Sequence, residues 1–367
     1  ADFDVADGRI AAITSAGQTP YEGPVVDLGQ GMAWPCFVDC HTHLDKGHIW
    51  ARSPNPDGTF EGALNAVGED RLSRWTADDV ARRMDFGLRT AFAHGTGAIR
   101  THLDSIAPQE TISWPVFSEI RDQWAGRIEL QAVSLVGIES VRETDWFLTL
   151  ADRVAEHGGI LGAVAYMVPD LDELLDVMFR AAIERNLELD FHTDETGDPA
   201  ARGLAHIADA ALRHSFEKPV LAGHCCSISR QADEESCRTL DKVAEAGISI
   251  VSLPLCNLYL QDRRTDGTTP LWRGVTMLHE IRARGISIAV ASDNTRDPFY
   301  AYGDLDGLEV YRQATRICHF DHPVGDWPLS VTGSAAKIMG LDGHGMLAVG
   351  GPADLILFRG RTWTELL

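Results

Sequence analysis

The sequence is organised around Pro35-Cys36-Phe37-Val38-Asp39-Cys40-His41-Thr42-His43-Leu44-Asp45-Lys46. Its apolar run, Cys36–Val38, leads directly into the pair His41 and His43. Side chains two residues apart in a β-strand point to the same face. Both imidazoles can therefore aim at one point beyond the end of a strand, which is a geometry that suits a transition metal. Two unrelated surface or core histidines are the alternative, so the interpretation depends on what the other strands supply.

Short apolar, β-branched runs recur along the chain between segments with helical periodicity. The expected strands are Cys36–Asp39, Gly97–His102, Ile128–Leu135, Ile160–Ala165, Leu187–His192, Pro219–Gly223, Ile248–Leu253 and Ile286–Ala291. The expected helices between them include Ala77–Ala93, Leu171–Arg185, Ala200–Arg213, Gln231–Ala246 and Val275–Arg284. Continuous apolar strands that alternate with helices indicate parallel strands covered on both faces. Because eight such strands close a barrel, we expect an α/β fold, a (β/α)8 TIM-type barrel, over residues 34–344.

The two ends of the chain differ from this pattern. Residues 1–33 hold the short runs Asp7–Ile13 and Val25–Gly29, and residues 345–367 hold a further run, Gly350–Phe358. Alternating apolar residues bounded by glycine and aspartate are typical of short strands and turns. We therefore expect residues 1–33 and 345–367 to form one small β-domain, a β-sandwich, from both chain ends.

Composition and charge restrict the class of partner. The chain has 367 residues, 44% of them hydrophobic and 23% charged, which is typical of a globular protein. Its net charge of -22 argues against nucleic acid or an anionic membrane as a partner and favours a small molecule. No apolar run reaches the roughly 20 residues that a membrane span needs. The seven scattered cysteines indicate reduced thiols, so we expect a cytoplasmic protein, with a homo-oligomer possible.

Residues suited to metal binding or proton transfer follow four of the expected strands. They are His41 and His43 after the first strand, His192 and Glu195 after the fifth, His224 after the sixth and Asp293 after the eighth. Catalytic groups of a barrel lie at the carboxyl ends of its strands. Any one of these residues could be a structural polar group, but four strand ends in register are hard to explain in that way. The fourth strand region, Gly159–Val168, has no Lys, Glu or His, which argues for a single metal ion.

Motifs along nearly the whole chain resemble the amidohydrolase superfamily. Three of them are Asp7-Gly8-Arg9-Ile10, Pro35 to His43, and Gly350-Gly351-Pro352-Ala353-Asp354-Leu355. Within the superfamily the chain is most similar to the cytosine deaminase group, through His192-x-Asp194-Glu195, Pro254-Leu255-Cys256-Asn257-Leu258-Tyr259-Leu260-Gln261 and Asp293-x-x-x-Asp297-Pro298-Phe299-Tyr300. Lys46 and the segment Ser292–Asp297 are also similar to the triazine-degrading N-alkylammelide hydrolases, such as N-isopropylammelide isopropylaminohydrolase.

The resemblance implies a mononuclear site for one divalent zinc or iron ion. The ligands that it implies are His41, His43, His192 and Asp293, and the catalytic residues that it implies are Glu195, His224 and Asp293. In that reaction an activated water attacks an amino-substituted N-heterocycle and ammonia leaves. Asp293 would accept the water proton, His224 would stabilise charge, and Glu195 would carry a proton to the ring nitrogen.

The substrate-binding positions depart from the cytosine deaminase pattern. That group has a glutamine after its third strand, where this chain has Val133–Gly137, and a second acid where this chain has Asn294. Its ring-stacking tryptophan corresponds to Phe299. We expect Asn294, Phe299, Lys46 and Thr59 to bind substrate.

Two buried or paired groups have a structural alternative. Lys46 could touch a substrate carbonyl or pair with Asp45, and the pairing is slightly favoured. His102 follows the second expected strand, and we interpret it as a buried, hydrogen-bonded histidine rather than a ligand.

The sequence as a whole predicts a hydrolase of C–N bonds other than peptide bonds, a cyclic amidine deaminase. Its substrate would be a cytosine-like pyrimidine, a pterin or a triazine. One alternative keeps the fold but hydrolyses a cyclic amide or an N-alkyl-amino heterocycle, which Asn294 and Lys46 allow. The other alternative, a non-catalytic metal-binding scaffold, is disfavoured by the complete set of ligand and acid–base residues.

Overall fold

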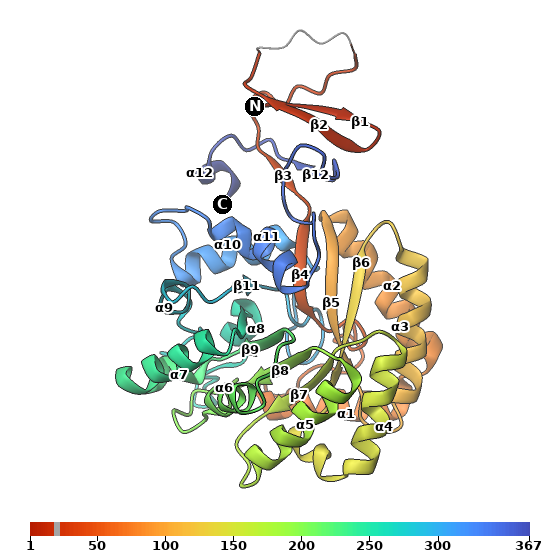
Figure 1. The fold of residues 1–367 in the computed structure, drawn as a ribbon, viewed down its shortest axis with the longest axis vertical. Helices are drawn as coiled ribbons and strands as arrows, with labels where there is room; N and C mark the ends of the chain where they lie inside the picture. The colour runs from red at the N-terminus through yellow and green to blue at the C-terminus, as the bar shows by residue number, and fades with distance from the viewer. Residues whose placement is uncertain (18–22) are drawn as a thin grey trace.

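Eight parallel strands form a closed barrel in the computed structural model, which describes residues 1–17 and 23–367. They are β4 (Phe37–Thr42), β5 (Thr96–Asp104), β6 (Glu129–Leu135), β7 (Leu161–Ala165), β8 (Leu189–Thr193), β9 (Val220–His224), β10 (Ser249–Ser252) and β11 (Ile288–Val290). β4 to β6 pair in order, as do β7 to β11 (Figure 1). Parallel bridges from Val133 to Ile160 and from Thr42 to Asp293 join the two groups. The predicted barrel is therefore confirmed.

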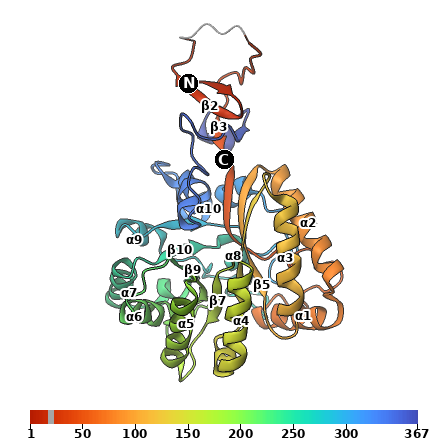
Figure 2. The same ribbon diagram turned by 45° about the vertical axis from the view of Figure 1, so that its right-hand side comes forward.

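Helices surround the barrel, as the sequence pattern predicts (Figures 1 and 2). They are α2 (Ala77–Ala93), α3 (Glu110–Trp124), α4 (Thr144–Glu156), α5 (Leu171–Arg185), α6 (Gly203–Arg213), α7 (Asp233–Glu245), α9 (Leu278–Ala283), α10 (Gly307–Cys318) and α11 (Gly333–Ile338). The buried apolar faces of most of them pack against the strands in one large core, and that of α11 packs in a second, smaller cluster. Three short 3-10 helices add to them: η1 (Ile138–Arg142), η2 (Ser227–Arg230) and η3 (Trp327–Val331).

Two further helices lie at the carboxyl ends of the strands. α1 (Phe60–Arg74) follows β4, and α8 (Pro254–Leu260) follows β10. The side chain of Thr59 caps α1 by accepting a hydrogen bond from the backbone N–H of Gly62, 2.9 Å away. Both helices contribute side chains to the site described below.

The two chain ends meet at the opposite end of the barrel (Figure 1). β1 (Asp2–Ala6) pairs with β2 (Arg9–Thr14), and β3 (Ala33–Pro35) pairs with β12 (Leu355–Leu357), in two antiparallel two-stranded sheets. α12 (Trp363–Leu366) ends the chain. Because β3 leads almost directly into β4, the end sheets are tied to the first barrel strand. The exact limits 1–33 and 345–367 stay a prediction, and residues 18–22 of the first range lie outside the described residues.

The expected strand at Val25–Gly29 is wrong. Val25 and Val26 are 69% and 75% exposed and have no strand partner among the described residues. Apolar residues form a strand only where another strand supplies hydrogen bonds and a surface to cover.

No helix in the described part of the chain combines the length and the apolar character that crossing a membrane requires.

Candidate functional site

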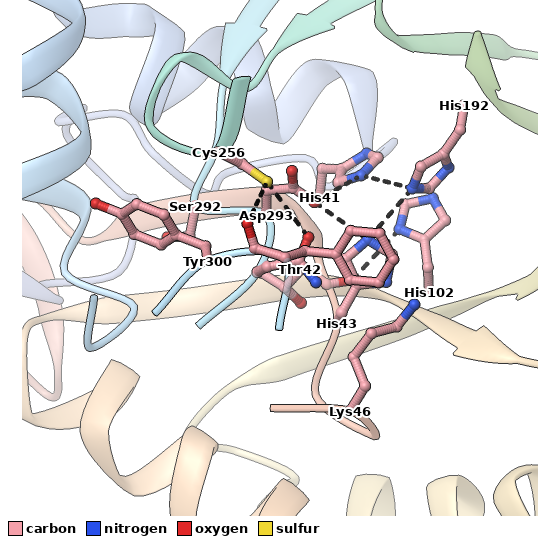
Figure 3. A network of polar contacts seen from close by, with 12 residues as sticks. His41, Thr42, His43, Lys46, His102, His192, Cys256, Ser292, Asp293 and Tyr300 are labelled. Carbon is pink, nitrogen blue, oxygen red and sulfur yellow. Dashed lines mark hydrogen bonds and ion pairs between the residues drawn. The ribbon is translucent and has the colours of Figure 1, made fainter. Parts of the chain in front are cut away.

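The predicted metal ligands come together at the carboxyl ends of three strands. His41 lies near the end of β4 and His43 directly after it, His192 lies in β8, and Asp293 follows β11. Figure 3 shows the three imidazoles turned toward one another beside Asp293. Nε2 of His192 lies 3.1 Å from Nε2 of His41 and 3.2 Å from Nε2 of His43. Oδ1 of Asp293 lies 3.1 Å from Nε2 of His43 and 3.5 Å from Nε2 of His41.

The protonation states of this cluster suit metal binding. Burial lowers the pKa of His43 and of His192 well below the ordinary value, so both imidazoles are neutral at pH 7. Burial raises the pKa of the Asp293 carboxyl, but its close contacts with the imidazoles of His41 and His43 outweigh burial and hold that pKa well below its usual range. Metal ligands must be neutral imidazoles and ionised carboxylates.

Unpartnered buried atoms provide a test of whether these residues fit a metal ion. Apart from the contacts of Oδ1 with the two imidazoles, both carboxylate oxygens of Asp293 are buried without a hydrogen-bond partner among the described residues. Buried charges without such partners are costly unless they coordinate a metal. His41, His192, His224 and Asp293 each offer a ligand atom, all within 4.8 Å of one another. A mixed imidazole and carboxylate set suits zinc, iron or manganese, so the residues present fit a divalent ion.

His102 lies beside this cluster, but both of its ring nitrogens contact other protein groups. Its Nε2 is 3.2 Å from Oδ1 of Asp190, and its Nδ1 is 3.4 Å from the carbonyl oxygen of Thr42. Asp190 is in turn paired with Arg100. His102 also belongs to a second possible four-histidine set with His41, His43 and His192. With both ring nitrogens facing protein atoms, the structure agrees with its interpretation as a buried, hydrogen-bonded residue.

Glu195 and His224, two of the predicted catalytic residues, meet beside the cluster. Oε1 of Glu195 lies 3.4 Å from Nδ1 of His224. Burial, and then the charge of Asp293, raise the pKa of Glu195 well above its usual value. Burial lowers the pKa of His224 to about 3. A carboxyl with a raised pKa can hold a proton near neutral pH and deliver it as a general acid.

No role is predicted from the sequence for Asn257, which lies in α8, or for Gln261, which lies at the end of that helix. Nδ2 of Asn257 lies 3.2 Å from Oε1 of Glu195 and 2.9 Å from Nδ1 of His224. Nε2 of Gln261 donates to the backbone carbonyl oxygen of Glu195 at 3.0 Å. Residues four apart on a helix lie on the same face. That spacing, after Pro254 starts the helix, is the signal that could have found them.

Backbone conformation turns the site residues inward. Asp194, His224, Cys225 and Asp293 have φ values of 56°, 68°, 50° and 64°, in the left-handed region that non-glycine residues seldom adopt. Such conformations cost about 1–3 kcal/mol each and cluster at functional sites. Asp194 also accepts hydrogen bonds from the backbone N–H groups of Gly203 and Leu204, which fixes the loop after β8 to the start of α6.

A Gly223→Ala substitution is expected to weaken metal binding without unfolding the barrel. A Cβ at position 223 would lie 3.0 Å from Cε1 and 3.3 Å from Nδ1 of His41, so the imidazole would have to move by a few tenths of an ångström. We expect roughly a 10-fold loss of metal affinity, the scale found when a ligand's support is disturbed. Titration of the metal-free protein with zinc measures it.

Gly68→Ala is the matched control for that substitution. Gly68 lies within α1, and a Cβ there meets nothing within 4 Å. The control should keep the affinity of the parent protein and gain about 0.5–1 kcal/mol in stability. Equal affinities for the two variants would contradict the role given to Gly223.

A cavity of about 680 Å³ opens beside the cluster. The residues at its polar end are His43, His192, Glu195, His224, Asp293 and Asn294. One face of α1, formed by Phe60, Leu64 and Val67, lines its apolar side, together with Val136 and Tyr166. A cavity of this volume suits a small ligand that is largely enclosed, with a few polar groups to orient it.

Three of the four predicted substrate-binding residues line this cavity. Phe299 is 8% exposed and lies with its ring 5.3 Å from Nζ of Lys46. Nδ2 of Asn294 donates to Oδ2 of Asp297 at 2.8 Å. Thr59 does not line the cavity. Its hydroxyl caps α1 and donates a hydrogen bond to Asp57.

The expected pairing of Lys46 with Asp45 needs correction. Nζ of Lys46 lies 2.8 Å from Oδ1 of Asp104, which also pairs with Arg71. Oδ2 of Asp45 instead accepts the backbone N–H of Asp104 at 2.7 Å. The charged partner is therefore supplied by β5, a segment distant in sequence.

Comparison with known proteins places the chain in a family. Residues 117–364 match the family model described as "Amidohydrolase family". A pterin deaminase of Rhizobium rhizogenes is 55% identical over 367 residues, which are 100% of this chain and 84% of that protein. A structure of 5-methylcytosine deaminase from Klebsiella pneumoniae, liganded with 5-fluorocytosine, has a TM-score of 0.88 and 26% identity, covering 98% of this chain and 88% of that one.

A third protein shares the fold. N-isopropylammelide isopropylaminohydrolase from Burkholderia multivorans has a TM-score of 0.79 at 24% identity, covering 99% of this chain and 88% of that chain. The resemblances found in the sequence, to the cytosine deaminase group and to the N-alkylammelide hydrolases, are thus confirmed. The family model covers more than half of the chain, and the curated relative is similar along all of it. This chain therefore belongs to the amidohydrolase family and is a hydrolase that acts on C–N bonds.

Proposed function

We propose that this protein is a metal-dependent pterin deaminase. Water would replace the exocyclic amino group of a 2-amino-4-oxopteridine, and ammonia would leave. The observation that carries the proposal is the buried Glu195, with its raised pKa, beside His224 and the His/Asp cluster at one end of a cavity of about 680 Å³. The 55% identity to a pterin deaminase over the whole of this chain favours a pterin over a smaller pyrimidine.

We propose that one divalent ion, zinc or iron, is held by His41, His43, His192 and Asp293. When bound, such an ion lowers the pKa of water at the site to about 7. The unpartnered oxygens of Asp293 and the short distances between the three Nε2 atoms support this set.

The remaining chemistry belongs to side chains of this protein. Asp293 accepts a proton from the attacking water, since its low pKa makes it a carboxylate beside the cluster. Glu195 protonates the ring nitrogen next to the reacting carbon and takes back a proton from the hydroxyl that water adds to that carbon. Asp293 returns the water proton to the departing amine, so that ammonia leaves and a ring carbonyl remains. The unpartnered Nε2 of His224 faces the same space and donates to the oxygen that develops negative charge.

The cavity walls would hold the bicyclic ring. Phe299 and the apolar face of α1 enclose it, and Asn294 and Lys46 contact its polar edge. Asp104 keeps the buried ammonium of Lys46 in place, which leaves its other N–H groups free to meet a ring carbonyl. These contacts replace the amide that the cytosine deaminase group places after its third strand.

Ammonia release from pterin, cytosine, guanine and an N-alkylammelide tests the function. The protein is assayed after chelation and again after reloading with zinc or iron. We expect turnover of pterin by the loaded protein, with one ammonia released per pterin deaminated. Metal-loaded protein that releases no ammonia from pterin would exclude the proposal, and release of an alkylamine from the ammelide would select hydrolysis of an N-alkyl group instead.

A cytoplasmic location, a homo-oligomer and the exclusion of nucleic acid as a partner stay predictions from the sequence. Their support is the net charge of -22 and the cysteine usage.

A further inference from the structure

Asn257 lies where two reactive side chains meet and is itself almost fully enclosed. It is 1% exposed, within α8, and its Nδ2 atom reaches both Oε1 of Glu195 and Nδ1 of His224. An amide nitrogen carries two hydrogens and no acceptor site. One amide group therefore supplies a donor to each of the two neighbours.

These contacts restrict where the neighbours carry protons. A ring nitrogen that faces an N–H donor must itself be unprotonated, so Nδ1 of His224 accepts and the single proton of its neutral ring is on Nε2. A doubly protonated ring would set two donors against each other. In the same way, Oε1 of Glu195 accepts, so a proton on this carboxyl is carried by Oε2.

Rotating the Asn257 amide by 180°, so that its oxygen and nitrogen exchange places, would remove this arrangement. The oxygen of Asn257 would then face Oε1 of Glu195, and two acceptors would meet unless the proton of the carboxyl moved to Oε1. The orientation with Nδ2 toward both neighbours gives Nδ1 of His224 and Oε1 of Glu195, which lie 3.4 Å apart, a shared donor group at 2.9 and 3.2 Å. It also accounts for the buried Nε2 of His224 without a protein partner, because that atom is left to donate into the site.

The helix that carries Asn257 is fixed at its far end as well. Gln261 donates to the backbone carbonyl of Glu195, and Gly274, at φ 73°, packs against the Gln261 side chain. A Cβ at position 274 would lie 2.4 Å from Cγ of Gln261. α8 is thereby held against Glu195 at two points: Asn257 contacts the carboxyl of Glu195, and Gln261 contacts its backbone carbonyl.

We propose that Asn257 is a positioning residue that keeps the proton of His224 on Nε2 and the proton of Glu195 on Oε2. Both protons then face the reacting centre. On this assignment His224 donates a hydrogen bond and is not a metal ligand, although it lies within a possible four-residue metal set. The inference rests on the proposed function for its catalytic consequence, but the proton positions themselves do not depend on the substrate.

Asn257→Asp is the decisive substitution because it keeps the shape and reverses the hydrogen bonding. A carboxylate only accepts, so it draws the His224 proton to Nδ1 and repels Glu195. We expect kcat for the deamination to fall by roughly 100-fold or more, KM to change by less than about 3-fold, and metal content to stay the same. Asn257→Ala, which imposes neither tautomer, should be less impaired than Asn257→Asp. Asn65→Asp, an exposed amide-to-acid change on α1, is the control and should be unaffected.

Long-range ¹H–¹⁵N NMR of histidine-labelled, zinc-loaded and metal-free protein reads the tautomer directly. Loss of signals in a His224→Asn variant assigns the ring. We expect an unprotonated Nδ1 in the parent protein and a protonated Nδ1 in Asn257→Asp. A protonated Nδ1 in the parent, or full kcat in Asn257→Asp, would overturn the inference. An Nε2 tautomer in a protein that deaminates no pterin would support the positioning and reject only the proposed function.

Discussion

A Glu195→Gln enzyme is expected to keep its metal and to lose about 10³- to 10⁴-fold in kcat with a pterin substrate. Glutamine has the shape of glutamate and can still interact with Asn257, but it cannot hold and release a proton. General acid–base catalysis by a positioned side chain contributes roughly 10²- to 10⁴-fold, and Glu195 is proposed to act in two proton transfers. Steady-state kinetics and metal analysis on the same preparation measure both quantities.

Glu139→Gln is the matched control for this substitution. Glu139 lines the same cavity, but it is hydrogen-bonded to the hydroxyl of Tyr166, away from the His/Asp cluster. Its variant should stay within a few-fold of the parent in kcat. Full turnover by metal-loaded Glu195→Gln would exclude Glu195 as the proton carrier, whatever the control shows.

An Asp293→Asn protein is expected to lose both its activity and most of its affinity for the metal. The substitution removes the only carboxylate among the proposed ligands and the acceptor for the water proton. We expect a fall in kcat of at least about 10⁴-fold, because two functions are lost together. Asp304→Asn, a partly exposed acid paired with Arg296 in the same segment of chain, is the control.

Thermal unfolding provides a second measurement for this variant. A ligand that binds only the folded state raises its stability in proportion to the logarithm of the ligand concentration over Kd. Added zinc should therefore raise the Tm of the parent and of Asp304→Asn, and should leave that of Asp293→Asn nearly unchanged. An equal rise in all three proteins would show that zinc binds without Asp293.

The sequence predicts the barrel well because its strands are continuous apolar runs, which need a sheet that is covered on both faces. The predicted limits of α2 and α5 match the observed ones, since Thr76 caps the first helix and Asn186, in a left-handed conformation, ends the second. α1 was not predicted, because the residues that it buries are mostly small or polar, such as Gly62, Ala63 and Asp70. The sequence predicts Thr59, the residue that caps this helix, as a substrate contact.

The proposed ligands could be placed together from the sequence because barrel register brings strand ends to one rim. The ion-pair partner of Lys46 could not be predicted in the same way. Its partner Asp104 comes from another strand, and the choice against Asp45 depends on a backbone N–H that already occupies that carboxylate. The role of Asn257 likewise depends on three side chains from three separate segments.

The seam between β4 and β11 has a consequence for how the protein matures. Asp293 pairs with Thr42 across this seam, and its backbone N–H donates to the carbonyl oxygen of His41 at 2.9 Å. During synthesis the three proposed histidine ligands leave the ribosome well before Asp293 does. The proposed site is complete only when the last strand docks on the first, so tight metal capture would mark a finished barrel, and an unfinished chain would hold the ion with histidines alone.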